Sequence, residues 1–520
     1  MIGKHDLIGP NGPDANVTIF LDRRQFVVGS AFAAAGLSAR VSPAAAAEKT
    51  LVVAASVFPP SLTSGLSSYQ SLALLTQTHD ALVYRDDFGK LNPGLATRWE
   101  RVDDKTMRFH LRQGVKFHDG VELTSEDVAF TINRVLDPQT GYGMLIRVSQ
   151  VADAKVVDKY TVDIHTKGIF PTLLTGLSDI VIEPKHYYEK VGAKAVPNRP
   201  IGTGPFVYQK WTAGDRYELT ANKDYWGGAP KFDRLVIREI PDSSVRIASL
   251  MAGESHIIQS LPFDLIPQVI GSGGAKVDQV TTTISLVLSF DTRVAPFNNP
   301  LVREAFDYAI DKEALRKEIL KGTGEILSGQ LLTSRTFGFN PDIKARPYDP
   351  DKARQLLKEA GYDGAKPFPI TTQSGKYASD IDLCNAIVGM LGNVGVSATI
   401  KVVEGGVWVQ MAGANQPGPM YLVGWYSLGD GDFCTTWYTS GSKRAQWTND
   451  EYEKLFIAAR STNDSDARLK AYRRMMEIMH AENPSVFLFG LPSLWGVSKS
   501  IKGFNSPPDE VFRLSKIEQA

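Results

Sequence analysis

The sequence predicts an α/β protein built from two or three structural units. Strand patterns with period-two alternation and helix patterns with capped starts follow one another along the chain. The chain has 520 residues, which exceeds a single ordinary domain. Hydrophobic residues make up 43% and charged residues 22%, which is typical of a globular protein in water. The net charge is zero, so the basic excess that nucleic-acid-binding proteins carry is absent.

The N-terminus predicts an export leader. Arg23 and Arg24 precede a modestly apolar stretch at residues 27–37, and small residues follow at 44–47. This order is typical of a twin-arginine (Tat-type) signal, so we expect cleavage after Ala47 and a periplasmic mature protein. Residues 1–20 read as an extension ahead of the leader. A membrane anchor is the alternative, but an apolar stretch of about 11 residues is too short to cross ~30 Å of hydrocarbon.

The first elements of the mature chain follow simple local rules. Residues 50–57 form an apolar strand pattern, and residues 107–111 alternate apolar and polar side chains. After a break at residues 113–114 the strand pattern resumes at 115–117, and a tight turn follows at 118–120. Thr124 then reads as an N-cap, with Asp127 three residues further on. The apolar residues that follow it predict one buried helix face.

Later segments carry equally clear signals. A Gly-Pro turn at residues 202–205 leads into an expected hairpin, after a linker-like stretch at 196–200. A strand is expected at residues 285–290. Asn299 followed by Pro300 predicts a capped helix start, and Asp311 and Asp349 predict two more.

Four blocks of this sequence, in this order, resemble the family 5 extracellular solute-binding proteins of ABC importers. The first block begins with LNPGLATRW at residue 91 and continues through HLRQGVKFHDG to the helix start TSEDV. The others are IGTGPF with NKDYWGGAPKFD, then PFNNPLVREAFDYAIDKEAL, and then DPDKARQLLKEAGY. The family includes dipeptide, oligopeptide, nickel and glutathione binders. The resemblance covers about residues 50–515.

The resemblance implies a two-lobed periplasmic-binding-protein fold (cluster C, class II) with an extra domain. Lobe I would be discontinuous and the extra domain would lie within it. The expected ranges are 48–75, 200–280 and 491–520 for lobe I, 76–199 for the extra domain, and 281–490 for lobe II. The implied function is the substrate-binding component of an ABC import system, a monomer that delivers a small polar ligand to a membrane permease. No cofactor is expected.

The strongest candidate for ligand contact is the segment at residues 420–438. An apolar strand pattern ends there at Gly424 and Trp425, and the ends of strands in α/β lobes face binding crevices. Aromatic walls with a few polar groups suit a small-ligand pocket. The alternative is that the aromatics pack inside the protein and the aspartates cap the next helix. The candidates in this segment are Trp425, Tyr426, Asp430, Asp432 and Trp437, with Phe433 and Tyr438 beside them.

This chain departs from the dipeptide and oligopeptide binders that it resembles. Those proteins carry an aspartate for the ligand ammonium three residues after the tryptophan, and this chain has Leu428 there. The loop where dipeptide binders place a carboxylate-binding arginine offers Lys376 and Tyr377 instead. Peptides or peptide-like conjugates are the first expected ligands, and opine- or sugar-like compounds are the alternative. Further candidates are Arg293 near the expected cleft edge and, on the opposite wall, Phe58 and Tyr69.

Catalytic motifs are absent from the sequence. It contains no HExxH and no GxSxG pattern, so a zinc hydrolase or a nucleophile-elbow enzyme is disfavoured. An exported hydrolase of peptides or glycosides is the rival function, and Asp430 with Asp432 would be its carboxylate pair. A metal-chelate or haem carrier ranks lower, since the histidines are scattered. Of the two cysteines, Cys384 is expected as a buried thiol on an apolar helix face, with a disulfide to Cys434 as the alternative.

Overall fold

The structure is a computed structural model that describes residues 48–62, 69–86, 89–364, 366–373, 376–377 and 379–520, without the side chains at 69, 144 and 146. The expected leader at residues 1–47 and the side chain of Tyr69 therefore lie outside the described residues. The remainder is a mixed α/β protein, which confirms the predicted class.

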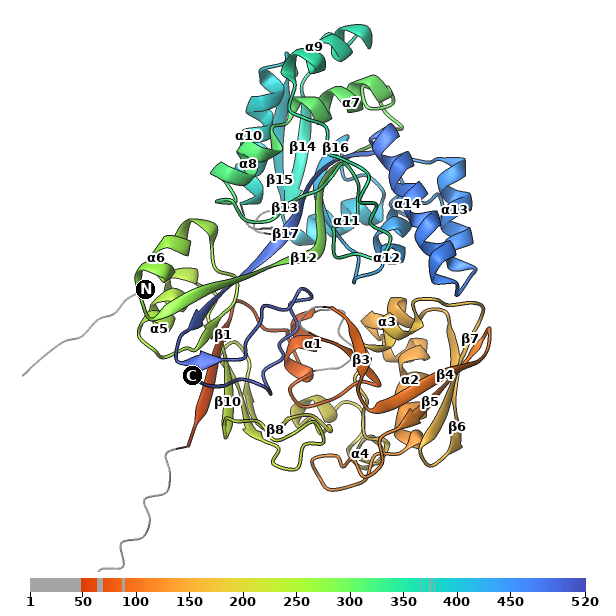
Figure 1. The fold of residues 1–520 in the computed structure, drawn as a ribbon, viewed down its shortest axis with the longest axis vertical. Coiled ribbons are helices and arrows are strands. Elements are labelled where there is room, and N and C mark those ends of the chain that lie inside the picture. Colours follow the sequence, from red (N-terminus) through yellow and green to blue (C-terminus); the bar gives the residue numbers. More distant parts are fainter. Residues whose placement is uncertain (1–47, 63–68, 87–88, 365, 374–375, 378) are drawn as a thin grey trace, which may run out of the picture. The chain divides into compact units, whose positions relative to one another are not determined.

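The main element is a large mixed sheet (Figure 1). Its strand order is β15-β14-β16-β12-β17-β11-β1-β10-β9-β8, and β13 pairs with β17 beside this path. The strands are β1 (Thr50–Ala55), β8 (Phe206–Thr212), β9 (Arg216–Ala221), β10 (Arg234–Glu239), β11 (Ile257–Ile258), β12 (Ala275–Phe290), β13 (Glu325–Ile326), β14 (Phe368–Gln373), β15 (Ala398–Val403), β16 (Met420–Tyr426) and β17 (Ser485–Ser498).

Strands β12 and β17 run through both halves of this sheet. They pair antiparallel along almost their whole length, and β12 also pairs with β16 at its C-terminal end. Their register shifts between Thr281 and Ser285, so residues 282–284 lie at an irregularity in the ladder. The sequence predicted only the C-terminal part of β12, because its residues 275–283 are mostly half-exposed and lack alternation. Pairing with β17 holds that part in the sheet, which local pattern does not reveal.

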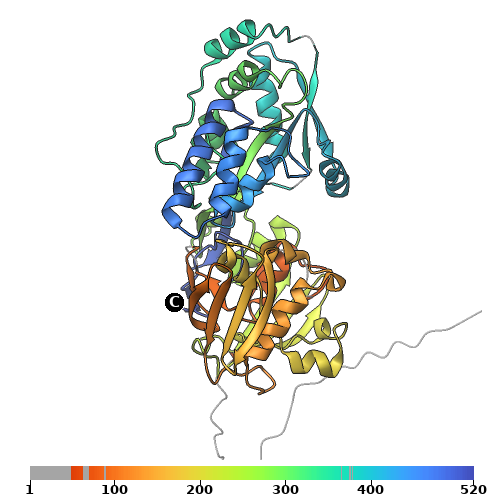
Figure 2. The same cartoon turned by 90° about the vertical axis from the view of Figure 1, so that its right-hand side faces the viewer.

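Two hydrophobic cores lie on opposite faces of the β14–β16–β12 part of the sheet. Leu286, Leu288 and Phe290 face a core that includes residues of α7 to α10, whereas Val287 faces a core that includes α11, α13 and α14. The alternation of one strand thus serves both layers. Figures 1 and 2 show α13 and α14 side by side. The helices of this part are α7 (Pro300–Ala309), α8 (Lys312–Glu318), α9 (Pro350–Glu359), α10 (Asp380–Gly392), α11 (Gly405–Gly413), α12 (Gly431–Thr435), α13 (Asp450–Arg460) and α14 (Ser465–Glu482).

A four-stranded antiparallel sheet in the order β4-β5-β7-β6 forms a separate layer with its own core. Helix α2 packs on it, and the predicted capping box between Thr124 and Asp127 is present. The predicted strand at 115–117 is reduced to one bridge between Lys116 and Glu122. The strands are β4 (Ala96–Asp103), β5 (Thr106–Leu111), β6 (Val151–Asp158) and β7 (Thr161–Thr166), and the helices around them are α2 (Ser125–Leu136), α3 (Leu173–Leu177) and α4 (Lys185–Val191).

Short elements complete the described chain. The linker-like stretch at 196–200 is not wholly irregular, because it contains a 3-10 turn. The short strands are β2 (Val83–Arg85) with β3 (Leu91–Pro93), and β18 (Ile501–Lys502) with β19 (Glu518–Gln519). The remaining helices are α1 (Tyr69–Leu75), α5 (Ser243–Met251), α6 (Ile266–Gly271) and the 3-10 turns η1 (Pro138–Thr140), η2 (Gly143–Val148), η3 (Val196–Asn198), η4 (Phe263–Leu265) and η5 (Thr436–Tyr438).

The predicted helix starts are confirmed by their caps. The side chain of Asn299 accepts a hydrogen bond from the Leu301 amide, and Asp311 and Asp349 cap α8 and α9 in the same way. Side-chain caps satisfy amides that the first turn of a helix leaves without partners. Among the described residues, no helix is both long and apolar enough to cross a membrane.

Candidate functional site

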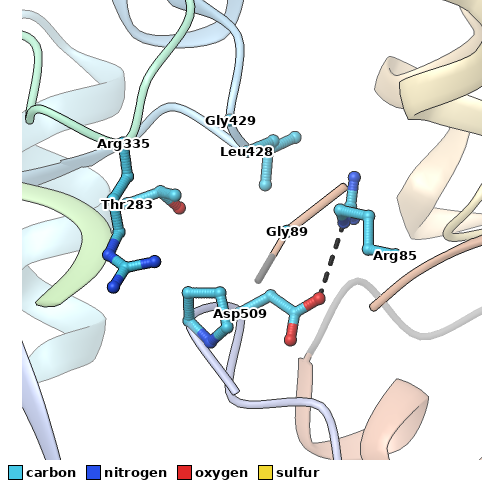
Figure 3. Close-up of a pocket in the computed structure, with 8 residues that line it drawn as sticks. Arg85, Gly89, Thr283, Arg335, Leu428, Gly429 and Asp509 are labelled. Atoms are coloured by element: carbon cyan, nitrogen blue, oxygen red, sulfur yellow. Dashed lines mark ion pairs between the residues drawn. The ribbon is translucent and has the colours of Figure 1, made fainter. Parts of the chain in front are cut away.

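A hollow of about 430 Å³, counted to its open mouth, lies where the large sheet changes register (Figure 3). Residues far apart in the sequence line it from two sides. We call one side the Leu428 edge and the other the Asp509 edge. The Leu428 edge consists of Thr283, Arg335, Leu428 and Gly429, and the Asp509 edge consists of Arg85, Gly89, Pro508 and Asp509.

The Leu428 edge is formed by a turn that follows β16. The Ser427 amide donates to the carbonyl of Thr283 at 3.0 Å, which ties the turn to the irregularity in β12. Leu428 and Gly429 then both have positive φ, 55° and 85°. Such a backbone is natural for glycine but costs a leucine about 1–2 kcal/mol. The turn therefore holds Leu428 in a conformation that its side chain does not favour.

The loop that carries Arg335 is bound to the same turn. The Phe337 amide donates to the carbonyl of Gly429 at 3.0 Å, and the Gly431 amide donates back to Phe337 at 2.9 Å. The hydroxyls of Thr336 and Ser427 lie 2.8 Å apart. Main-chain and side-chain bonds thus join the two segments directly after Arg335.

Asp430 supports this turn from behind. Its carboxylate accepts two bonds from Arg468, at 2.9 and 3.0 Å, and it also caps α12 through the Asp432 amide. Both side chains are buried, and the Arg468 guanidinium lies over the ring of Phe337. Burial raises the pKa of Asp430, while the charge of Arg468 works against that rise.

Asp432 is held in a similar way. Arg460 pairs with it at 3.1 Å, and the Tyr472 hydroxyl donates to it at 3.3 Å. Burial raises its pKa, which the charge of Arg460 opposes. Both aspartates therefore have arginine partners inside the protein. This arrangement favours the capping and packing interpretation of these residues over ligand contact.

The predicted aromatic residues form a packed group rather than a wall of the hollow. Trp425 stacks on Trp437 with ring centres 5.5 Å apart, and its indole nitrogen donates to the hydroxyl of Tyr438. Trp425 is buried in the core that includes α13 and α14. Tyr426 points from the other face of β16 and packs on the opposite core. None of these four residues lines the hollow.

Tyr377, Lys376, Arg293 and Phe58 are dispersed. Tyr377 is buried, accepts a bond from the Gly424 amide at 2.7 Å, and has its pKa raised to about 12 by burial. Lys376 has an exposed side chain. Arg293 pairs with Asp291 at 2.7 Å and donates to the carbonyl of Asn415. Phe58 is buried and stacks on Trp211. None of these four residues lines the hollow between the two edges.

The Asp509 edge is a network of paired charges. Arg513 forms a bidentate pair with Asp509 at 2.6 and 2.9 Å, and Arg85 approaches the same carboxylate at 3.5 Å. Arg85 also pairs with Asp179. Burial pushes the pKa of Asp509 upward, but the two arginines outweigh burial and hold this pKa below its usual range. Arg85 and Asp509 also border a larger hollow of about 1310 Å³, counted to its open mouth.

Arg335, Arg85 and Asp509 were not among the sequence-predicted site residues. Each lies in a loop, at a strand end or in a short turn without a recognisable motif, and their meeting depends on the pairing of β12 with β17. The departure at Leu428 was the one signal that pointed to this place.

Other chemistry has little support in the described part of the chain. There, no group of three or more His, Cys, Asp or Glu side chains is placed to hold a metal ion. Cys384 and Cys434 are both buried free thiols, which confirms the prediction for Cys384.

Comparison with known proteins decides the family. The model for bacterial extracellular solute-binding proteins, family 5 Middle, matches residues 90–446. The chain belongs to this family. It is therefore a solute-binding protein of ABC import, as the sequence blocks predicted.

Two relatives and one solved structure illustrate the match. The chain is 30% identical to the dipeptide-binding protein of Escherichia coli (strain K12) over 460 residues, or 80% of this chain and 84% of that protein. It is 29% identical to the glutathione-binding protein GsiB of Salmonella typhimurium, over 94% of this chain and 98% of that protein. The periplasmic binding protein DppA of Helicobacter pylori, in complex with the peptide STSA, superposes with a TM-score of 0.77 at 26% identity, over 91% and 98% of the two chains. The predicted two-lobed fold is confirmed by this likeness.

Proposed function

We propose that this solute-binding protein captures a peptide or a peptide-like conjugate in the hollow between the Leu428 and Asp509 edges and delivers it to an ABC permease. The observation that carries the proposal is the lining itself, in which charged, hydroxyl and apolar groups from distant parts of the chain converge. A few placed polar groups beside apolar side chains in a concave surface suit a small polar ligand. The dipeptide- and glutathione-binding relatives support the ligand class.

The proposed mechanism is ligand-stabilised closure of two lobes. We assign residues 48–75, 200–280 and 491–520 to lobe I, 76–199 to an extra domain, and 281–490 to lobe II. Contacts of one ligand to both lobes would favour the closed form by their differential free energy. The two long strands β12 and β17 connect these lobes, and their register shift is the proposed hinge.

Gly490 supports a hinge at this place. It lies opposite the shift, and a Cβ atom there would come within 2.9 Å of the Thr281 side chain and 3.0 Å of Thr333. A side chain at this position would push the two strands apart. A glycine at position 490 thus allows the backbone segments to approach closely at the register shift between β12 and β17.

The export of this protein is part of the proposal. The twin arginine at residues 23–24 and the small residues before Ala47 support a cleaved Tat-type leader. The unit that contains all the described residues begins at Glu48, the residue after the expected cleavage site. Mass spectrometry of the mature protein from a native periplasm would show a chain that begins at Glu48, and an intact N-terminus would contradict the proposal.

A ligand screen tests the function. Dipeptides, glutathione, opines and oligosaccharides would be compared by thermal shift and then by calorimetry on the purified mature protein. A ligand that binds only the native state raises its stability by mass action. We expect peptides or glutathione to give the largest shift, with no turnover of the bound compound. Stabilisation by opines or sugars alone would overturn the peptide assignment, and product formation would establish the hydrolase instead.

Two variants at Thr283 connect binding to the hollow. Thr283 is half-exposed and lines the hollow, so Thr283→Tyr would fill the space that the ligand needs. Thr283→Ser keeps the hydroxyl and the space. We expect the tyrosine variant to lose binding and the serine variant to retain it. If both variants bind as the wild type does, the ligand site lies elsewhere.

A further inference from the structure

Arg335 differs from the other arginines around the hollow. Its side chain is exposed, and Figure 3 shows it reaching past Thr283 toward the segment that carries Asp509. Within the described part of the chain, no residue forms a hydrogen bond or an ion pair with its guanidinium. Arg85, by contrast, pairs with Asp179 and Asp509. A guanidinium that lines a hollow without a protein partner is available to a ligand.

The backbone on both sides of Arg335 is fixed. The amide and the hydroxyl of Ser334 donate to the two oxygens of Glu325, at 2.9 and 2.8 Å. On the other side, Thr336 and Phe337 are bonded to the turn at residues 427–431. When a ligand binds, only the side chain of Arg335 then loses conformational freedom, because the backbone is already ordered. The entropic cost of binding is therefore small. Its planar fork matches a carboxylate in two parallel bonds.

The charges of the lining favour an anion. It contains two arginines and one aspartate, and that aspartate is already neutralised by Arg513. The Leu428 edge contributes no acid to the lining. Behind this edge, Asp430 and Asp432 have arginine partners, and Glu325 accepts the amide and the hydroxyl of Ser334. The hollow therefore presents an unpaired positive charge beside an apolar side chain.

We propose that Arg335 binds a carboxylate of the ligand and thereby determines specificity, while Leu428 and Pro508 contact the apolar part of the same ligand. The inference rests on the proposed function and deepens it. The ligand class is a carboxylate-bearing peptide-like compound whose free acid, rather than its ammonium group, is the required feature.

Matched ligand pairs test this role. The dipeptide Ala-Leu would be compared with its C-terminal amide, and glutathione with its dimethyl ester, by calorimetry on the wild type and on Arg335→Gln. We expect the wild type to bind the free acids about 10- to 100-fold more tightly than their neutral forms. In Arg335→Gln, the acids should weaken by a similar factor and the difference within each pair should nearly vanish, as for two groups that act on each other.

Two further variants separate charge from fork geometry. Arg335→Lys should fall between the wild type and Arg335→Gln, because a lysine keeps the charge but not the bidentate geometry. Arg101→Gln removes an exposed arginine of β4, outside the hollow lining, and should leave every affinity unchanged.

The outcomes distinguish this inference from the function on which it rests. If the wild type binds acids and neutral forms equally, or if Arg335→Gln weakens both forms by the same factor or neither, the role of Arg335 is overturned and the peptide-binding function stands. If none of the four compounds binds the wild type, the peptide-like assignment fails and the role of Arg335 fails with it.

Discussion

The two edges of the hollow use charge in opposite ways. On the Asp509 edge the charges are paired with one another, through Arg513 and Arg85. Behind the Leu428 edge, Asp430 and Asp432 pair with Arg468 and Arg460, and on the edge itself one cation, Arg335, faces the hollow. The comparison teaches that a charged residue near a binding hollow indicates ligand contact only when its interactions within the protein are known. A paired charge positions the backbone, whereas an unpaired one can select a ligand.

Removal of the arginine behind the Leu428 edge should have the largest effect. Arg468→Ala leaves the buried carboxylate of Asp430 without its cation, and breaking a buried ion pair on one side costs about 3–5 kcal/mol. Chemical denaturation of the mature protein would measure this loss in the free energy of unfolding.

Arg460→Ala is the matched control for that variant. Arg460 pairs with Asp432, but its own side chain is 38% exposed, against 8% for Arg468. Water can replace part of what it supplies, so we expect a loss of only about 1 kcal/mol. Equal losses in the two variants would show that the two pairs do not differ in the way their burial indicates.

The Asp509 edge should respond to acid. Asp509→Asn removes the carboxylate shared by Arg513 and Arg85, at a cost of about 2 kcal/mol at pH 7. Because the folded protein holds the pKa of Asp509 below its usual range, the carboxylate stabilises the fold above about pH 3.9 and loses this effect as the pH falls further.

Unfolding curves between pH 7 and pH 2 would measure this dependence. The wild type and Asp509→Asn should differ most at neutral pH and converge at the acid end. A difference that stays constant with pH would mean that the side chain acts through packing rather than through its charge.

The sequence predicted the elements that depend on local rules. The capping box at Thr124, the start of α7 at Asn299 and the alternation in β5 need only neighbouring residues, and each is present. The N-terminal half of β12 was missed, since a half-exposed strand that pairs with another long strand has no local signature. The fold came from a sequence resemblance that covers most of the chain.

The composition of the predicted site residues allows two interpretations, for a physical reason. Aromatic and acidic residues at 425–438 have the composition of a pocket, but the same composition builds a core with internal ion pairs. The composition does not distinguish the two. The contacts in the structure, such as those of Asp430 with Arg468 and of Trp425 with Trp437, favour the core. Arg335 lies about 90 residues from that segment, so its place beside Leu428 could not be read from spacing. Ligand contact by the predicted residues stays a prediction.

Glu510 offers a sharper version of the comparison, because it follows Asp509 directly. Burial raises the pKa of Glu510, and the hydrogen bond from Ser493 and the charge of Lys376 only partly oppose this rise. Its carboxylate accepts one long bond, from Ser493 at 3.4 Å. The ionised form is therefore unfavourable in the folded state, and stability should fall as the pH rises above about 4.3.

Glu510→Gln should remove this penalty. The amide oxygen keeps the bond from Ser493, and we expect a gain of about 1 kcal/mol at pH 7 that disappears at pH 4. The pH dependence would be opposite to that of Asp509→Asn in the same unfolding assay. A loss of stability at neutral pH would show that Glu510 works as a paired charge like its neighbour.

Arg335→Gln should have the smallest effect on the fold. Its guanidinium is exposed and has no partner among the described residues, so the free energy of unfolding without ligand should change by less than about 0.5 kcal/mol. The same substitution should reduce the stabilisation that glutathione gives in a thermal-shift assay, because that stabilisation depends on affinity. A large loss of stability without ligand would place Arg335 with the paired charges and remove the difference between the two edges. An unchanged fold with weakened ligand stabilisation would instead mark it as a charge kept free for the ligand.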